Sequence, residues 1–254
     1  MNKHQPRKRF GQNFLHNAHI IDSIVSHIRP SLADNMVEIG PGFGAITLPL
    51  LKQLSKLKVI EIDRDLAFIL HKKKLVNLEI FIADALKFDF GQLAQKQKLR
   101  IVGNLPYNIS TPLLFYLLSF RTLIKDMHFL LQKEVVERIC AQPNNKKYGR
   151  LSVILQSQCE LENLLAVPSN AFNPVPKVES RLLRISPKPY QHNIKALETI
   201  VKTSFSKRRK TLLNNLKDIC NKEQLKTAPV DLSLRAENLS VADFIALSSW
   251  YQKQ

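Results

Sequence analysis

The stretch VEIGPGFGAIT, residues 37–47, constrains the fold of this chain more than any other segment. An apolar run leads into it, glycines follow at Gly40, Gly42 and Gly44, and an apolar stripe with helical spacing continues to Leu54. This order predicts a strand, a tight turn and a helix. Because glycine adopts dihedrals that other residues avoid and lets a ligand approach without meeting a Cβ, the turn is a candidate nucleotide site.

The next predicted strand, KVIEID, supports that interpretation. It brings Glu61 and Asp63 to its carboxyl end about 20 residues after the glycines, where a carboxylate can accept hydrogen bonds from ribose hydroxyls. The spacing of Gly40, Gly42 and Ala45 also satisfies the dinucleotide-binding pattern. A nicotinamide cofactor is therefore an alternative, and so is a turn with a purely structural role.

Predicted strands and helices alternate through the N-terminal part of the chain. Beyond the two strands above, apolar runs predict a buried strand at 78–83 and further strands at 99–104 and 126–132. Apolar residues with helical spacing predict helices at 20–28, 64–73, 111–120, near 133–141 and near 151–159. Such alternation implies an α/β fold, a parallel sheet covered on both faces. Ligands of these sheets bind beyond the carboxyl strand ends, where Gly40, Glu61, Asp84 and Asn104 fall.

The tetrapeptide NLPY, residues 104–107, suggests the chemistry. It supplies a side-chain carbonyl on Asn104, a proline-stiffened backbone and the flat ring of Tyr107. Two carbonyl acceptors can orient an exocyclic amine of a base, whose lone pair is otherwise delocalised into the ring, while the tyrosine stacks on the base. No metal is required. The alternative is a proline-stiffened turn with a half-buried tyrosine.

The composition points to a polyanionic partner. The formal net charge is +17 and the pI is near 9.9, which favours nucleic acid over an anionic membrane surface. No segment approaches the ~20 apolar residues of a spanning helix, and no signal peptide is evident, so we expect a cytoplasmic protein. The cysteines Cys140, Cys159 and Cys220 are too widely spaced for a zinc knuckle and are interpreted as reduced thiols.

Two domains are predicted. Residues 1–187 form the larger one, beginning with a basic arm and motif at 1–16, and the Pro-rich polar stretch 186–193 leads to a small helical domain at 188–254. Helices are expected at 194–205 and 208–217, with a last one capped by Ser240 and Asp243.

Basic clusters in both domains are candidate RNA contacts. The cations Arg208, Arg209 and Lys210 are interpreted as phosphate ligands, with a solvated face as the alternative. The basic arm at 3–9 and the loop at 146–150 stay open between RNA contact and solvation.

An ordered set of motifs identifies a resemblance. It comprises FGQNFL at 10–15, VEIGPGFGAIT, VIEID, DAL at 84–86, NLPY, FNPVPKVES at 172–180 and FSKRRKTLLNNL at 205–216. Together these motifs resemble the ribosomal RNA adenine dimethylases, and within that family the enzymes that act on the small subunit. The resemblance covers nearly the whole chain. Glu179 departs from the family's pattern, which has aspartate there.

The resemblance implies a Rossmann-like methyltransferase sheet with a small all-α C-terminal domain, and S-adenosylmethionine as cofactor. It implies a cofactor pocket lined by Asn13, Leu15, Gly40, Glu61, Asp84 and Asn104. Asn104 and the carbonyl of Leu105 would hold the target amine, with Tyr107 on one face of the adenine and Phe172 on the other. The implied substrate is a pair of adjacent adenines near the 3′ end of 16S rRNA in an assembling small subunit, dimethylated by a monomeric enzyme without metal.

Alternatives from other classes remain. A nicotinamide dehydrogenase would share the glycine loop but leave NLPY unexplained. A non-catalytic RNA-binding assembly factor would share the fold, although every implied cofactor position is filled. Within the methyltransferases, the alternative is a large-subunit rRNA adenine methylase of the antibiotic-resistance type.

Overall fold

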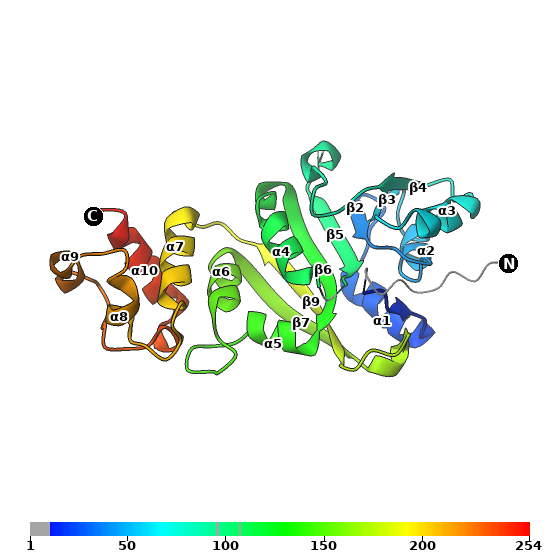
Figure 1. Ribbon diagram of the computed structural model, residues 1–254. Helices are drawn as coiled ribbons and strands as arrows, with labels where there is room; N and C mark the ends of the chain where they lie inside the picture. The colour runs from blue at the N-terminus through cyan, green and yellow to red at the C-terminus, as the bar shows by residue number, and fades with distance from the viewer. Residues whose placement is uncertain (1–10, 95–96, 107) are drawn as a thin grey trace. The chain divides into compact units, whose positions relative to one another are not determined.

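The computed structural model describes residues 11–94, 97–106 and 108–254 and divides into two compact units (Figure 1). The first contains the chain up to Lys133 together with Leu161–Pro187, and the second contains Glu134–Glu160 and Lys188–Gln254. From sequence, everything before residue 188 was expected in the larger domain. The structure instead groups residues 134–160 with the C-terminal residues, because a helix of this segment packs against the C-terminal helices.

A seven-stranded sheet forms the core of the first unit, in the order β4-β3-β2-β5-β6-β9-β7. Its strands are β2 (Asn35–Ile39), β3 (Leu57–Glu61), β4 (Leu78–Ile82), β5 (Leu99–Asn104), β6 (Ile124–Gln132), β7 (Cys159–Val167) and β9 (Ser180–Pro187). Strands β4, β3, β2, β5 and β6 run parallel, and β9 pairs antiparallel with β6. A separate small sheet pairs β1 (Phe14–Leu15) antiparallel with β8 (Phe172–Asn173). The predicted α/β fold is confirmed.

An α-helix follows each parallel strand except β4, which is followed by a 3-10 turn, so the predicted alternation holds for most of the sheet (Figure 1). The helices of this unit are α1 (Ala18–Ile28), α2 (Thr47–Leu51), α3 (Arg64–Lys72) and α4 (Ser110–Leu118), with 3-10 turns at Phe90–Leu93, Arg121–Leu123 and Ser169–Ala171. Asp63 caps α3 by accepting the backbone N–H of Asp65 at 3.1 Å. A residue that closely follows the end of β3 thus also starts the next helix.

Alternation along the strands determines which side chains share a face of the sheet. Met36, Leu57 and Val102 pack in one apolar cluster with residues of α1 and α2. Because successive strand residues point to opposite faces, Glu38 lies two residues beyond Met36 on this same face, and Asn104 two beyond Val102. The apolar face therefore ends in polar groups at the carboxyl rim.

A buried ion-pair network fastens the end of α1 to the sheet. Arg100 is 6% exposed; its guanidinium donates to Asp126 at 2.9 Å and to Asp34 at 2.7 Å. It also donates to the carbonyls of Ile28 and Arg29 at 2.6 and 3.0 Å, where the helix ends. The cation thereby satisfies terminal carbonyls and complements the negative end of the helix dipole.

Helices make up most of the second unit. They are α5 (Lys133–Ile139, whose first residue belongs to the first unit), α6 (Arg150–Gln158), α7 (Ile194–Ser204), α8 (Leu212–Leu216), α9 (Lys222–Lys226) and α10 (Val241–Tyr251), with a 3-10 turn at Ala236–Asn238. Phe205 packs between the rings of Tyr148 and Phe244, at centroid distances of 6.3 and 5.7 Å. The predicted capping box is confirmed: the Ser240 hydroxyl accepts the N–H of Asp243, whose carboxylate accepts the N–H of Ser240.

Two predictions about elements were wrong, and two strands of the large sheet were not predicted. The strand at 78–83 is not buried, because β4 is the edge strand of the sheet and Ile82 is 58% exposed. Strands β7 and β9 were missed. The helix expected at 208–217 spans only Leu212–Leu216, so the cations before it lie in a turn. Among the helices described, none has the length and apolar character needed to span a membrane.

Candidate cofactor and base-binding site

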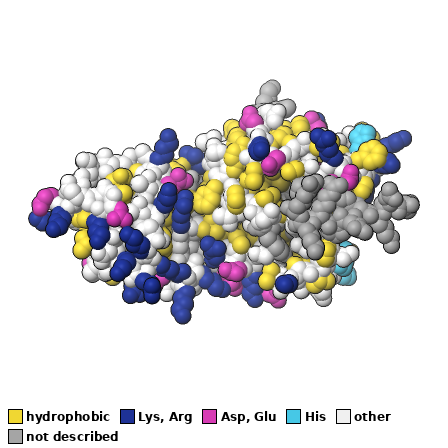
Figure 2. All heavy atoms as spheres, viewed as in Figure 1, with side chains coloured by type: hydrophobic (Ala, Val, Ile, Leu, Met, Phe, Trp, Pro, Cys, Tyr) yellow, Lys and Arg dark blue, Asp and Glu magenta, His cyan; other side chains and the backbone are white. Residues whose placement is uncertain are grey.

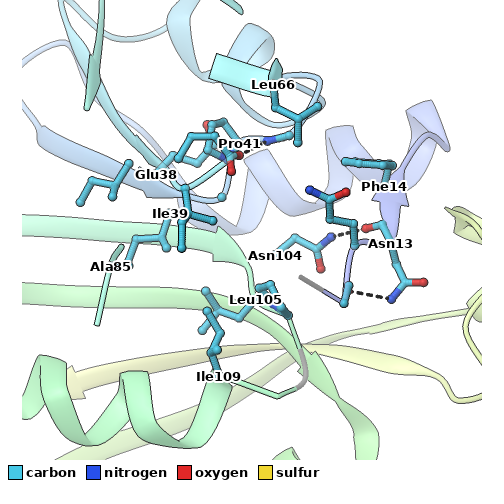
Figure 3. A pocket seen from close by; sticks show the side chains of 18 of the residues that line it. Asn13, Phe14, Glu38, Ile39, Pro41, Leu66, Ala85, Asn104, Leu105 and Ile109 are labelled. Carbon is cyan, nitrogen blue, oxygen red and sulfur yellow. Dashed lines mark hydrogen bonds between the residues drawn. The ribbon is translucent and has the colours of Figure 1, made fainter. Parts of the chain in front are cut away.

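A pocket of about 210 Å³ lies at the carboxyl ends of β2, β3 and β5 (Figure 3). The glycine loop, the strand ends and the FGQNFL motif line it together. Its described lining includes seven of the residues singled out by sequence: Asn13, Leu15, Gly40, Glu61, Asp84, Asn104 and Leu105.

The glycine loop has the backbone that its sequence predicts. Gly40 and Gly42 adopt φ values of 68° and 57°, a region that favours glycine. A Cβ on Gly42 would also lie 3.1 Å from the ring of Phe14. Glycine is therefore required at this position both by conformation and by the close approach of the N-terminal motif.

Glu61 links the glycine loop to the end of β3. It is 4% exposed, and its carboxylate accepts the backbone N–H of Gly42 at 3.2 Å and that of Asp63 at 2.9 Å. Burial raises the pKa of Glu61, with the two hydrogen bonds opposing that shift and the charge of Asp63 adding to it. The carboxylate is thus held in place before any ligand hydroxyl reaches it.

Glu38 is a pocket residue that the sequence analysis missed. It lies on β2, is 2% exposed, and its Oε2 accepts a hydrogen bond from the Thr47 hydroxyl at 2.6 Å. Burial raises the pKa of Glu38 to about 7; the Thr47 hydrogen bond opposes the shift and the charge of Glu61 adds to it. The available signal was a carboxylate inside the apolar run that leads into the glycine loop.

The N-terminal motif positions Asn104. Its side-chain nitrogen donates to the backbone carbonyl of Asn13 at 2.8 Å, a contact drawn in Figure 3. Gln12 fastens the same motif to the end of β3, because its amide donates to Asp63 at 3.1 Å. With the nitrogen of Asn104 turned toward Asn13, its Oδ1 is the atom directed elsewhere as an acceptor. The N-terminal motif thus orients the polar group of NLPY.

The pocket is acidic in a strongly basic protein. Glu38, Glu61 and Asp84 line it, and no Lys, Arg or His is found among its described lining residues. Within the same described part of the chain, no group of His, Cys, Asp and Glu side chains could hold a metal ion. The charge of the pocket suits a cationic ligand and disfavours a pyrophosphate.

Of the two aromatic residues predicted to stack on the base, the structure describes only Phe172. Tyr107 lies outside the described residues. Phe172 pairs with Leu15 between β8 and β1, is 1% exposed and belongs to the apolar core cluster. The structure therefore buries the ring of Phe172 instead of presenting it at the pocket, because burying a phenyl ring among apolar neighbours stabilises the fold by roughly 1.5–3 kcal/mol.

The three cations predicted to bind phosphate lie in the second unit and differ in whether they form an ion pair. Arg208 donates to Glu237 at 3.0 Å and its guanidinium also contacts the carbonyl of Lys146. Arg209 and Lys210 are exposed and have no ion pair with any residue that the structure describes. The turn at 207–210 and the loop at 146–150 are thus neighbours, and Figure 2 shows Lys and Arg side chains over this unit. The basic arm at 3–9 lies outside the described residues.

Glu179, which departs from the family's pattern, lies on the surface. Its carboxylate pairs with Lys133 at 3.0 Å, and its backbone carbonyl accepts the N–H of the same lysine at 2.9 Å. Both side chains are more than 40% exposed. The residue connects the segment before β9 to the first residue of α5.

The sheet, with its antiparallel strand after β6 and the pocket at its carboxyl rim, has the architecture of the α/β methyltransferases. A family model described as "Ribosomal RNA adenine dimethylase" matches residues 3–253. The chain belongs to that family, and the predicted resemblance is confirmed.

Relatives match over nearly the full length. The proteins named "Ribosomal RNA small subunit methyltransferase A" from Saccharophagus degradans and Legionella pneumophila are each 52% identical, over 98% of this chain and 96% and 98% of theirs. A dimethyladenosine transferase from Plasmodium falciparum has a TM-score of 0.81 at 29% identity, covering 94% of this chain and 98% of that one. The 23S rRNA methyltransferase ErmE has a TM-score of 0.71 at 23% identity, covering 94% and 100%, and shares the fold.

Proposed function

We propose that this protein transfers methyl groups from S-adenosylmethionine to the exocyclic N6 of two adjacent adenines near the 3′ end of 16S rRNA. It dimethylates each adenine, acting as a monomer on an assembling small ribosomal subunit. Family membership and the names of the full-length relatives support this substrate. The observation that carries the proposal is Asn104, held by Asn13 at the rim of an acidic pocket.

The charge of the pocket supports the cofactor. S-adenosylmethionine carries a sulfonium and an ammonium against one carboxylate, whereas a nicotinamide dinucleotide carries an anionic pyrophosphate. The described lining of the pocket holds three carboxyl groups and no cation, which favours S-adenosylmethionine and argues against a nicotinamide-dependent dehydrogenase. Glu61 would accept the ribose hydroxyls and Asp84 would bind at the adenine, with Asn13, Leu15 and Gly40 completing the pocket. When bound, the cofactor supplies an electrophilic methyl group.

The chain's own task is to orient a poor nucleophile. The lone pair of an adenine amine is delocalised into the ring. Oδ1 of Asn104 and the carbonyl of Leu105 would each accept one N–H of the amine and favour the form whose lone pair is directed out of the plane. Tyr107, outside the described residues, would stack on the base. Neither a metal nor a strong base is part of this mechanism.

A methylation assay tests the substrate. Small and large ribosomal subunits from a strain that lacks the modification are incubated separately with the protein and S-adenosylmethionine, and their 16S and 23S rRNA are analysed by mass spectrometry. The proposal expects two neighbouring dimethyladenines in 16S rRNA and none in 23S rRNA. Methylation confined to 23S rRNA would identify a large-subunit methylase, and binding without methylation would identify an assembly factor.

A second test addresses the cofactor. Glu61→Ala should weaken S-adenosylmethionine binding by roughly 1.5–3 kcal/mol, the worth of hydrogen bonds to a charged group. Because Glu61 also holds the N–H of Gly42, the isosteric Glu61→Gln is the matched variant that keeps an acceptor for the loop. Calorimetry measures both. Unchanged affinity in the folded Ala variant, or tight binding of NAD by the parent, would remove the assignment.

A further inference from the structure

Glu38 is a buried carboxyl group in the pocket wall for which the proposed methyl transfer has no use. Its cross-strand neighbours on β3 and β5 are Val59 and Val102, both fully buried and apolar. Among the described residues, the one side-chain hydrogen bond that Glu38 accepts comes from the neutral hydroxyl of Thr47 on α2. The group therefore sits at the junction of the apolar core and the pocket, where a charge is poorly solvated.

The charged group that acts on Glu38 is another carboxylate. Glu61, at the end of β3, opposes ionisation of Glu38, and α2 contributes only the Thr47 hydroxyl, which favours it. Asp84 adds a third carboxyl to the lining, and the described lining contains no cation to balance them. Burial and Glu61 together raise the pKa of Glu38 to about 7, so near neutral pH the free protein holds about half a proton on this group.

We propose that Glu38 responds to the positive charge of the cofactor, holding a proton in the free protein and releasing it to solvent when S-adenosylmethionine binds. The inference rests on the proposed function. A cation that enters the pocket favours the charged form of a nearby carboxyl group, so the O–H bond of Glu38 breaks and the proton leaves to water. By linkage, the carboxylate then favours the cationic cofactor over its neutral thioether product, S-adenosylhomocysteine.

Proton release can be counted directly. The full-length parent and Glu38→Gln are titrated with S-adenosylmethionine by calorimetry at pH 7, in buffers that differ in ionisation enthalpy. The parent should release about half a proton more than the variant. Ionisable groups of the cofactor contribute equally to both titrations and cancel in the difference. Equal proton release by parent and variant overturns the inference.

The pH dependence of ligand preference gives a second, independent readout. For the parent, the ratio of S-adenosylmethionine to S-adenosylhomocysteine affinity should rise by up to about tenfold from pH 6 to pH 8, and for Glu38→Gln it should stay level. Thr47→Val, nearly isosteric, removes the hydrogen bond that favours the carboxylate and should move the midpoint of the rise to higher pH.

These outcomes separate the two proposals. A parent that fails to bind S-adenosylmethionine would overturn the proposed function. A parent that binds it with a level affinity ratio across this pH range overturns the role of Glu38 alone. If Glu38→Gln does not fold, the parent profile and its displacement in Thr47→Val still decide the question.

Discussion

Asn104 is the side chain on which the proposed chemistry depends most. Asn104→Ala removes one of two acceptors for the target amine, so the methylation rate should fall by about 100-fold or more, as when one preorganised polar group is lost from an active site. Single-turnover methylation of small subunits measures this. Affinity for RNA should barely change, because phosphate contacts elsewhere supply it. A variant that loses RNA binding and rate together would contradict a role confined to the amine.

Two buried residues should give the folded protein opposite dependences on pH. The pKa of Glu38 is raised from 4.5 to about 7, so its stabilising contribution is complete below pH 4.5 and is lost as the pH rises through 7. The pKa of His128 is lowered by burial from 6.5 to about 4, so its contribution is complete above pH 6.5 and is lost as the pH falls through 4. Between pH 4.5 and 6.5 the two contributions to the free energy of unfolding change in opposite directions and largely cancel.

Single variants should expose each contribution. Relative to the parent, His128→Gln should gain unfolding free energy as the pH falls from 6.5 to 4.5, and Glu38→Gln should lose it over the same range, each by roughly 3 kcal/mol at most. Urea unfolding at a series of pH values is the measurement. Identical profiles for all three proteins would mean that neither group titrates as its burial requires.

At the scale of single residues, sequence predicted those site residues whose position follows from local structure. Gly40, Glu61 and Asn104 each end a recognisable strand or open the turn after it, so the topology of a parallel sheet brings them together. Glu38 was missed, because its burial depends on how α2 packs against the sheet. Phe172 was misplaced for the same kind of reason: its small strand pairs with the N-terminal motif, a contact between distant segments.

The N-terminal motif is an element whose role only the structure reveals. Its amide contact from Gln12 to Asp63 fastens residues 11–15 over the end of β3, which keeps the carbonyl of Asn13 in reach of Asn104. Gln12→Ala should weaken cofactor binding by about 0.5–1.5 kcal/mol, the net worth of such a hydrogen bond. Calorimetry checks this against Gln53→Ala, an exposed glutamine after α2, whose affinity should match the parent.

The elements that sequence predicted well are those with an uninterrupted apolar run. Strands β2, β3, β5 and β6 are buried on both faces, and their nearly continuous apolar sequences predict this burial. The outermost strand β7 is exposed or half-buried over most of its length, and the last residues of β9 have the composition of a Pro-rich linker. Helix α8 begins late, because Leu212 donates to the carbonyl of Leu234 and Thr211 forms a bridge with Arg235, which holds the preceding turn.

Across the whole molecule, the sign of the charge differs between the chain as a whole and the lining of its pocket. The chain carries a net +17, yet the described lining of its pocket holds three carboxyl groups and no cation. A positive field attracts RNA at a distance without regard to sequence. An acidic pocket within that field suits a small cationic ligand. This separation of charge agrees with the proposed binding of RNA at the surface and of S-adenosylmethionine in the pocket.

The surface charge yields a prediction that distinguishes RNA contact from internal support. Arg209 and Lys210 have no described ion pair, whereas Arg208 is engaged by Glu237 and by the carbonyl of Lys146. Replacing Arg209 and Lys210 together with Ala should lower the slope of log RNA affinity against log salt by about 1.5, since each phosphate contact contributes roughly 0.7–0.9. The melting temperature should not change. Cofactor affinity should also match the parent.

Arg208→Ala is the matched variant from the same turn. Its ion pair is half exposed, so its loss should reduce the free energy of unfolding by about 1 kcal/mol or less, with a correspondingly small fall in melting temperature. The salt slope should stay close to that of the parent. Salt titrations of RNA binding and thermal unfolding of the two variants decide the matter. If Arg208→Ala flattens the salt slope while the double variant leaves it unchanged, the turn binds RNA through Arg208. Arg209 and Lys210 are then solvated side chains that do not contact phosphate.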